Sequence, residues 1–430
     1  MNLRTKLSGL ILAVALIATS CASDATVSAA DSTTSSTTTT TAPSETVATT
    51  STPTTLEPVE DSTGETETSI PEPTPTTAAP GPDGPAILTS YEFAPGLVDG
   101  RPTQVQGLLG VPAGPGPFPV AIVMHGSHPP CVDDFIPETF SEAIVTETNP
   151  SLCGAEFPEY IRHDVGLGHV VIALNDVGIA AVSIDVESAY VWWGGEPFEF
   201  GTVEEIIETH VDVLTRLDDG EDLGLGIDSI SDRLALDQIS LIGHSRSGGH
   251  VVSILEASST LPFDPLTVVA IEPDVGFPPS DLLDVPVLLI RGECDEDVGA
   301  EAGRDFLVEV LDPARLAPAI DLFIPAAGHR MLNTGLNGST CPERGDRSLI
   351  QAQLARGVSS FVASSGQQIE LLDDVGATVE TLRGNAPIEE VISGPVGYDP
   401  QRVPNAVSTV ELVPPLPQDA DYSDALIEDF

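Results

Sequence analysis

Apolar and polar positions alternate in blocks along the chain from residue 84 onward. Most apolar runs are continuous, as in strands buried on both faces of a parallel sheet, and the stretches between them have helical spacing. We predict strands over 118–126, 178–186, 239–245, 267–273, 285–292 and 319–328, and helices over 169–178, 202–217, 301–311 and 348–362. The pattern predicts an α/β domain over 84–365, with a mostly parallel central sheet and helices on both faces.

The block pattern stops on both sides of this domain. Residues 366–430 contain scattered apolar segments, several prolines and a very acidic end, which is compatible with an edge strand or two, or with a loose tail. We expect a partly ordered, acidic C-terminal extension. Residues 21–83 are rich in Thr, Ser and Pro, and they have too few large apolar side chains to offset the entropy of ordering. They predict a disordered stalk.

The first twenty residues have the pattern of an export signal. Arg4 and Lys6 precede an apolar run that is too short to span a bilayer. ATSC at 18–21 resembles a bacterial lipobox, although Ala18 stands where Leu is commonest. We expect export as a cell-surface lipoprotein anchored by a lipid on Cys21, with simple secretion as the alternative. The lipid would be the only contact with the membrane.

The charge balance narrows the choice of partners. The chain has 16 Lys and Arg against 66 Asp and Glu, a formal net charge of −50. Such an acidic surface argues against nucleic acids and anionic lipids as partners. Salt adaptation and genomic base composition both remain as explanations. We expect no cofactor and assume a monomer, although the sequence does not determine the oligomeric state.

Four cysteines remain if Cys21 carries the lipid. An even number in an exported domain favours two disulfides, and three connectivities are possible. We favour Cys131–Cys153 and Cys294–Cys341, because each would tie down one loop.

A metal site is the rival interpretation of part of this region. HGSHPPC at 125–131 places His125, His128 and Cys131 at ligand-like spacing. No second cluster completes the set, so we expect no bound metal.

LIGHSRSGGH, residues 241–250, contains two candidate nucleophiles. A nucleophile elbow needs a strand that ends abruptly, a serine two residues after a glycine, and a helix that starts there. Ser245 fits, because an apolar strand ends at Gly243 and helical spacing begins at Arg246. Ser247 would require a buried strand to continue through polar and glycine residues. We therefore predict Ser245 as the nucleophile, with a helix N-cap serine as the structural alternative.

Candidate partners follow two later strands. Asp295 comes three residues after the end of the strand 285–292, with Asp297 as the alternative acid, and His329 follows the strand 319–328. The chain order Ser, Asp, His is that of hydrolases with a strand–turn–helix nucleophile. In this arrangement the imidazole accepts the serine proton, and the carboxylate orients the imidazole. A structural loop histidine and a turn aspartate are the alternatives.

Acyl transfer also needs donors for the oxyanion. We predict the backbone N–H of Arg246, at the start of the helix, and that of Ser127, in the HGS turn after the strand 118–126. A plain glycine turn is the alternative for HGS.

These motifs together resemble the α/β-hydrolase superfamily over about residues 100–365. The matching segments are HGS (125–127), GHSRSGG (243–249), GECDEDV (292–298) and AGHR (327–330). More narrowly, the chain is similar to secreted bacterial hydrolases of the chlorophyllase, dienelactone hydrolase and platelet-activating-factor acetylhydrolase group. The resemblance implies an α/β-hydrolase fold and an esterase-type serine hydrolase. Ser247 departs from the pattern, which has glycine there.

We therefore expect an exported carboxylic-ester hydrolase with a small-molecule or polymeric ester as substrate. Trp192 and Trp193 lie in a loop that would reach the rim of the site, as would His128, although these side chains would equally serve packing. A hydrolase fold that has lost its activity and serves as a binding module is the main alternative. A peptidase or a C–C bond hydrolase would use the same triad.

Overall fold

The structure is a computed structural model. The described residues are 83–84, 86–93, 96–98, 101–128, 160–190, 201–227, 230–256, 259–275, 282–336, 346–383, 390–394 and 407–409. Every described residue belongs to the compact unit of residues 75–430. The predicted export signal, Cys21 and the predicted stalk up to residue 82 lie outside the described residues. No described helix is long and apolar enough to cross a bilayer.

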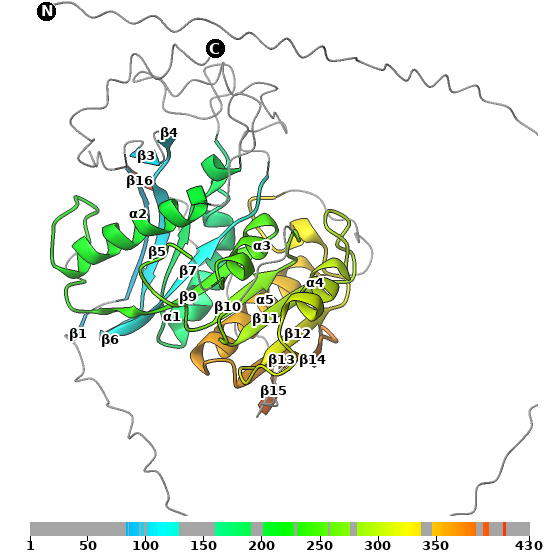
Figure 1. Cartoon of the computed structure of the whole chain (residues 1–430). Helices are drawn as coiled ribbons and strands as arrows, with labels where there is room; N and C mark the ends of the chain where they lie inside the picture. The colour runs from blue at the N-terminus through cyan, green and yellow to red at the C-terminus, as the bar shows by residue number, and fades with distance from the viewer. Residues whose placement is uncertain are drawn as a thin grey trace, which may run out of the picture. The chain divides into compact units, whose positions relative to one another are not determined.

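The described strands build one large mixed sheet and three small ones. The large sheet has ten strands in the order β14-β12-β11-β10-β9-β7-β8-β5-β2-β16 (Figure 1). In chain order these strands are β2 (Ile87–Glu92), β5 (Gln106–Val111), β7 (Phe118–Met124), β8 (Ala180–Ile184), β9 (Leu234–His244), β10 (Val268–Ile271), β11 (Val287–Gly292), β12 (Ala319–Ile324), β14 (Thr378–Arg383) and β16 (Val407–Thr409). The small sheets pair β1 (Asp83–Gly84) with β6 (Gly114–Pro115), β3 (Gly96–Val98) with β4 (Arg101–Thr103), and β13 (Gln368–Leu372) with β15 (Glu390–Gly394).

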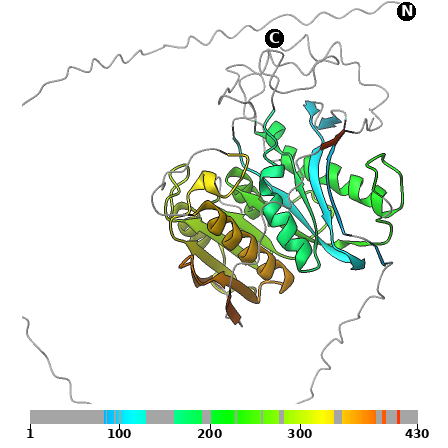
Figure 2. The ribbon, with the colours of Figure 1, turned by 180° about the vertical axis from the view of Figure 1, so that it is seen from behind.

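Helices cover both faces of the sheet, as the apolar pattern predicts. Along β7, Val120 and Ile122 belong to one hydrophobic core and Ala121 and Val123 to the other, because successive side chains of a strand point to opposite faces. The first core is closed by α2 (Gly201–Asp218), α3 (Arg246–Ser253) and α4 (Ala302–Val310), and the second by α1 (Gly168–Asp176) and α5 (Arg347–Ala363) (Figures 1 and 2). Three short 3₁₀ helices complete the elements: η1 (Val165–Leu167), η2 (Glu187–Ala189) and η3 (His329–Met331).

The predicted α/β architecture with a mostly parallel sheet is confirmed. Strand β9 begins at Leu234, earlier than the apolar run ISLI indicates, because its first half is only partly buried and includes polar residues. The edges of the sheet are less regular. There, β14 runs antiparallel to β12, and β16 pairs with β2 at the other edge, so the segment 366–430 supplies a strand to each edge.

The register of the central strands brings six loops to one edge. Strands β8, β7, β9, β10, β11 and β12 are parallel to one another, so their carboxyl ends lie at the same edge. His244 at the end of β9 is paired with Ile271 at the end of β10, and Gly292 of β11 is paired with Ile324 of β12. Parallel α/β sheets carry their functional residues at this edge.

Candidate active site

The turn between β9 and α3 has the backbone geometry of a strained elbow. Ser245 stands between the last residue of β9 and the first residue of α3, with φ 58° and ψ −125°. Its amide donates to the carbonyl of Ile271 at 2.9 Å, which fixes the turn against β10. A non-glycine residue in this region costs on the order of 1–3 kcal/mol, and such strain concentrates at functional sites.

Two glycines, which have no Cβ, allow the close backbone contacts of this turn. A Cβ on Gly243 would lie 2.1 Å from the carbonyl oxygen of Ser247, and a Cβ on Gly126 would lie 2.3 Å from the Cβ of Ser245. Both distances are shorter than any tolerated contact. The glycine of the HGS turn therefore packs directly against the elbow serine, so Ser127 and Arg246, the predicted oxyanion donors, are each adjacent in sequence to a residue of this contact.

Ser247 occupies a different environment from Ser245. It lies in α3 with no exposed surface, and its hydroxyl donates to the carbonyl of His125 at 2.5 Å. The hydroxyl of Tyr190 lies 2.5 Å from the same Oγ. Ser247 thus ties the helix of the elbow to the HGS turn, which is a structural task that glycine at this position would not perform.

The structure brings His329 and Asp295 together. His329 opens η3 just after β12, and its Nδ1 lies 3.2 Å from Oδ1 of Asp295. The same Oδ1 accepts the amides of Asp297 and Val298, both at 3.1 Å. The carboxylate of Asp297, the alternative acid, lies 3.5 Å from Arg330 at the surface and is 41% exposed. Asp295 is therefore the aspartate of this loop that contacts the imidazole.

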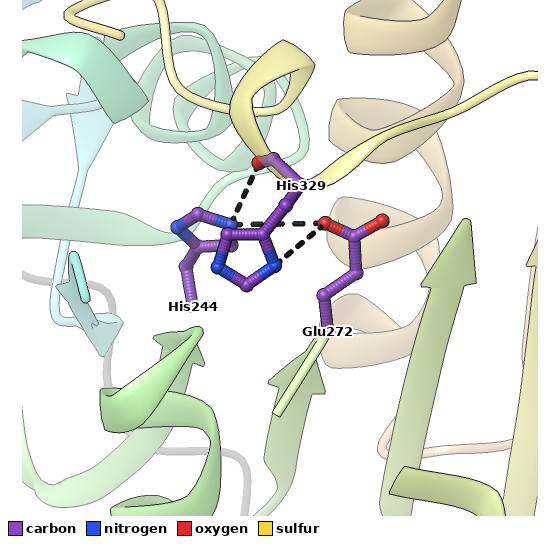
Figure 3. A group of neighbouring side chains, drawn as sticks. All are labelled: His244, Glu272 and His329. Carbon is purple, nitrogen blue, oxygen red and sulfur yellow. Dashed lines mark hydrogen bonds and ion pairs between the residues drawn. The ribbon is translucent and has the colours of Figure 1, made fainter. Parts of the chain in front are cut away.

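His329 is held close to the elbow through its backbone. His244, directly before Ser245, lies with Nε2 3.1 Å from the carbonyl oxygen of His329, and the two rings are 4.7 Å apart (Figure 3). Burial and the neighbouring His329 lower the pKa of His244 well below its usual range. A neutral His244 whose Nε2–H donates to this carbonyl links the end of β9 to η3.

Glu272 is a site residue that the sequence analysis missed. It follows β10 with φ 41°, and its side chain is fully buried. Its Oε2 lies 3.5 Å from Nδ1 of His329 and 3.9 Å from Nε2 of His244 (Figure 3). Burial, and then the charges of Asp295 and Asp297, raise the pKa of Glu272 well above its usual range. The available signal was an acidic residue directly after a continuous apolar run.

His244, Glu272 and His329 also have the residue types of a metal site. One ligand atom from each lies within 4.8 Å of the others, and all three side chains are buried. The set that the sequence suggested is different. His125 and His128 are described, but His125 lies with Nδ1 2.7 Å from the carbonyl of Gly126 and with Nε2 3.2 Å from Asp185, and Cys131 lies outside the described residues.

A second buried network supports the HGS turn from behind. Asp185 contacts Nε2 of His125 at 3.2 Å and accepts the hydroxyl of Tyr160 at 2.6 Å. Burial, the largest single effect, lowers the pKa of His125, but the hydrogen bond and charge of Asp185, together with Glu187 and the Gly126 carbonyl, raise it above its usual value. Burial raises the pKa of the neighbouring Glu187 to about 8. Oε2 of Glu187 accepts the amide of His128 at 3.4 Å.

His128, one of the predicted rim residues, lies next to the two histidines of the candidate site. Its ring is 5.4 Å from that of His244 and 6.1 Å from that of His329. Burial, and then the neighbouring histidines, lower its pKa well below the usual range, so the ring next to the elbow is neutral. Trp192 and Trp193, the other predicted rim residues, lie outside the described residues.

Only one of the four cysteines in the predicted disulfides lies among the described residues. Cys294, next to Asp295, is disulfide-bonded, and its amide donates to the carbonyl of Ala327 at 2.8 Å. Cys131, Cys153 and Cys341 lie outside the described residues. The pairings Cys131–Cys153 and Cys294–Cys341 therefore stay predictions.

Comparison with known proteins does not assign the chain to a family. No model of a known protein family matches it, and no curated protein matches it either. The function is therefore argued from the residues of the site.

Proposed function

We propose that the chain is an exported serine hydrolase with an α/β-hydrolase fold, and that it cleaves carboxylic esters through an acyl-Ser245 intermediate. One observation carries the proposal. A serine with φ 58° stands at the junction of β9 and α3, at the sheet edge that also carries a buried histidine–aspartate pair. A strained strand–turn–helix serine, followed along the chain by an acid and a histidine, is the arrangement of this class of hydrolase.

In the proposed reaction, the Oγ of Ser245 attacks the ester carbonyl while His329 accepts the hydroxyl proton through Nε2. Asp295 at Nδ1 orients the ring and stabilises the imidazolium that forms. The N–H groups of Ser127 and Arg246 are the proposed donors to the oxyanion. The imidazolium then protonates the leaving alcohol. Water then attacks the acyl-serine while His329 accepts a water proton, and the imidazolium returns that proton to Ser245 Oγ as the C–O bond breaks and the acid leaves.

The preference for an ester rests on the resemblance to esterase-type hydrolases rather than on the site geometry. The same triad is able to cleave an amide or a C–C bond, since fold and triad do not fix the substrate. A small-molecule or polymeric ester is the substrate class we propose. Export, with a lipid on Cys21 as the anchor, completes the proposal.

The proposal is tested with the purified full chain and matched p-nitrophenyl esters and p-nitroanilides of the same acyl group. We expect ester cleavage, little anilide cleavage, and loss of both in Ser245→Ala. Asp297→Asn is the matched control, because Asp297 is exposed and contacts Arg330 rather than His329. A folded wild-type protein that cleaves neither substrate would favour a binding module instead.

A further inference from the structure

Two carboxylates face one nitrogen in this site. Oδ1 of Asp295 lies 3.2 Å and Oε2 of Glu272 lies 3.5 Å from Nδ1 of His329. Asp295 comes from the loop after β11, and Glu272 from the end of the neighbouring β10. The imidazole has one N–H at Nδ1, so only one of the two acids is able to serve as its close acceptor at a time.

The surroundings of the two acids differ. Asp295 Oδ1 accepts two backbone amides, which stabilise a negative charge. Both oxygens of Glu272 are buried, and the backbone amide of Gly292, which lowers the pKa of this carboxyl, only partly offsets the effect of burial. A buried charge that is only partly compensated is costly, and a second charge beside Asp295 raises that cost. We therefore assign the charge of the pair to Asp295 and a proton to Glu272.

Glu272 is built into the site rather than placed there by a flexible side chain. Its backbone has φ 41°, in a region that β-strand residues rarely enter. Its Oε1 fills the space beside Gly292, where an added Cβ would lie 2.3 Å away. The carboxyl is thus packed against the strand that leads to Asp295, with its other oxygen directed at His329 (Figure 3).

We propose that Glu272 is a second positioning residue for His329, which takes over as the charged partner of the imidazole when Asp295 is neutral. The proposal rests on the proposed hydrolase function. The charge of Asp295 is one reason that Glu272 holds its proton. Without that charge, Glu272 ionises at a lower pH and accepts the Nδ1–H itself, from a position that needs no change of backbone.

The alternative interpretation is that His244, Glu272 and His329 bind a metal ion. It would require Nε2 of His244 to leave the carbonyl of His329 at 3.1 Å, and Nδ1 of His329 to leave Asp295 at 3.2 Å. In the structure, Nε2 of His244 is hydrogen-bonded to a carbonyl, and Nδ1 of His329 lies within ion-pair distance of Asp295. We therefore favour this arrangement, and metal binding becomes an outcome of the test.

The test compares Asp295→Asn, Glu272→Gln, the double variant and the control Glu301→Gln, an exposed acid away from the site, in the full chain. The readouts are the rate of fluorophosphonate labelling and the kcat and KM for a p-nitrophenyl ester, from pH 6 to pH 9. Loss of a triad aspartate alone can cost about 10⁴-fold. Here we expect kcat of Asp295→Asn to fall by about 10- to 100-fold at pH 9, and that of the double variant by at least about 10³-fold.

The pH dependence of kcat distinguishes a charged Glu272 from one that only packs in the site. A purely structural Glu272 would leave this pH dependence unchanged. The groups that face Glu272 are His244 from β9, His329 from η3, and Asp295 and Asp297 from the loop after β11. The kcat of Asp295→Asn relative to wild type should rise with pH as Glu272 ionises. This rise should be missing in the double variant, while Glu272→Gln alone loses less than about tenfold, because Asp295 remains.

Equal rates for Asp295→Asn and the double variant, with both folded by thermal unfolding, would overturn the proposal. So would loss of wild-type activity on EDTA treatment and its recovery with Zn²⁺, because the three side chains would then be metal ligands. The low-field proton resonance of the His329 Nδ1–H offers a test that does not need activity. It should persist in Asp295→Asn and disappear in the double variant. Failure of the hydrolase proposal is distinct, since the wild type itself would then be inactive.

Discussion

Two buried clusters at the same sheet edge use the same residue types in different ways. Each consists of one histidine and two carboxylates: His329 with Asp295 and Glu272, and His125 with Asp185 and Glu187. In the first cluster both carboxylates lie at the same ring nitrogen, Nδ1. In the second they lie at opposite nitrogens, with Asp185 at Nε2 and Glu187 3.9 Å from Nδ1.

Under the proposed function, this difference distinguishes a catalytic base, His329, from a supporting histidine, His125. An imidazole whose Nε2 is taken by a fixed carboxylate has no nitrogen left for a serine hydroxyl. His125 is in this position, and Ser247 donates to its carbonyl at 2.5 Å, so the ring fixes the HGS turn. Neither acid contacts Nε2 of His329, and that nitrogen is the one the proposed reaction uses. The residue types of such a cluster therefore do not determine its role. The role depends on which nitrogen of the histidine ring the carboxylates contact.

The largest expected effect comes from the same substitution made in each cluster. The amide of an asparagine is able to replace Nδ1 of a histidine but not Nε2. His329→Asn should therefore keep its contact with Asp295, lose the base, and reduce kcat for ester cleavage by about 10⁴-fold or more. Its free energy of unfolding should change by less than about 1 kcal/mol. Ester kinetics and urea unfolding check the two halves of this prediction.

His125→Asn should show the opposite balance. It removes the Nε2 contact and leaves the buried Asp185 without its histidine, although Tyr160 still donates to that carboxylate. We expect a loss of about 2–4 kcal/mol in the free energy of unfolding, because a buried charge loses its partner. A His125→Asn protein as stable as wild type, or a His329→Asn protein with intact kcat, would remove the distinction between the clusters.

The pH dependence of stability provides a further test of the His125 cluster, through Glu187. Glu187 has its pKa raised to about 8 in the folded protein, against 4.5 for an ordinary glutamate. Between these values the folded state holds a proton that the unfolded state has lost. Stability from this group is full below pH 4.5 and is lost as the pH rises toward 8, by at most about 1.4 kcal/mol per pH unit.

Glu187→Gln keeps a neutral side chain at every pH and should abolish this loss. The free energy of unfolding of the variant relative to wild type should therefore increase by a few kcal/mol between pH 5 and pH 8. Urea unfolding at both pH values measures it. Glu301→Gln is the control, because Glu301 is 65% exposed. Parallel curves for wild type and Glu187→Gln would show that Glu187 is already charged in the folded protein.

Ser247→Ala should give the smallest effect. It removes the donor to the carbonyl of His125, while the hydroxyl of Tyr190 keeps Nδ1 of His250 at 3.0 Å as a partner. We expect a loss of about 1–2 kcal/mol in stability. The kcat should fall by less than about tenfold, because the hydroxyl supports the HGS turn without touching the reacting atoms. A loss of kcat as large as that of Ser245→Ala would reverse the roles assigned to the two serines.

Local sequence signals account for much of this architecture. Continuous apolar runs predicted the central strands, and a strand followed by glycines and a helical pattern located the turn at Ser245. The proximity of Asp295 and His329 followed from the rule that parallel strands end at one edge. These inferences need only neighbours along the chain and the general rules of α/β sheets.

Contacts between distant segments were harder to predict. Glu272 reads as the end of an apolar strand, and nothing local shows that its φ of 41° directs the side chain toward a histidine 57 residues later. The role of Asp185 and Glu187 likewise depends on His125, which follows a different strand, β7. Which nitrogen of a histidine a carboxylate approaches is set by tertiary packing, so it leaves no pattern in the sequence.

The most direct test is to treat the folded full chain with a fluorophosphonate and to map the adduct by mass spectrometry. Wild type, Ser245→Ala and Ser247→Ala are compared under the same conditions. We predict one adduct, on Ser245, in wild type and Ser247→Ala, and none in Ser245→Ala. An adduct on Ser247, or no adduct on folded wild-type protein, would contradict the assignment of Ser245 as the nucleophile of a serine hydrolase.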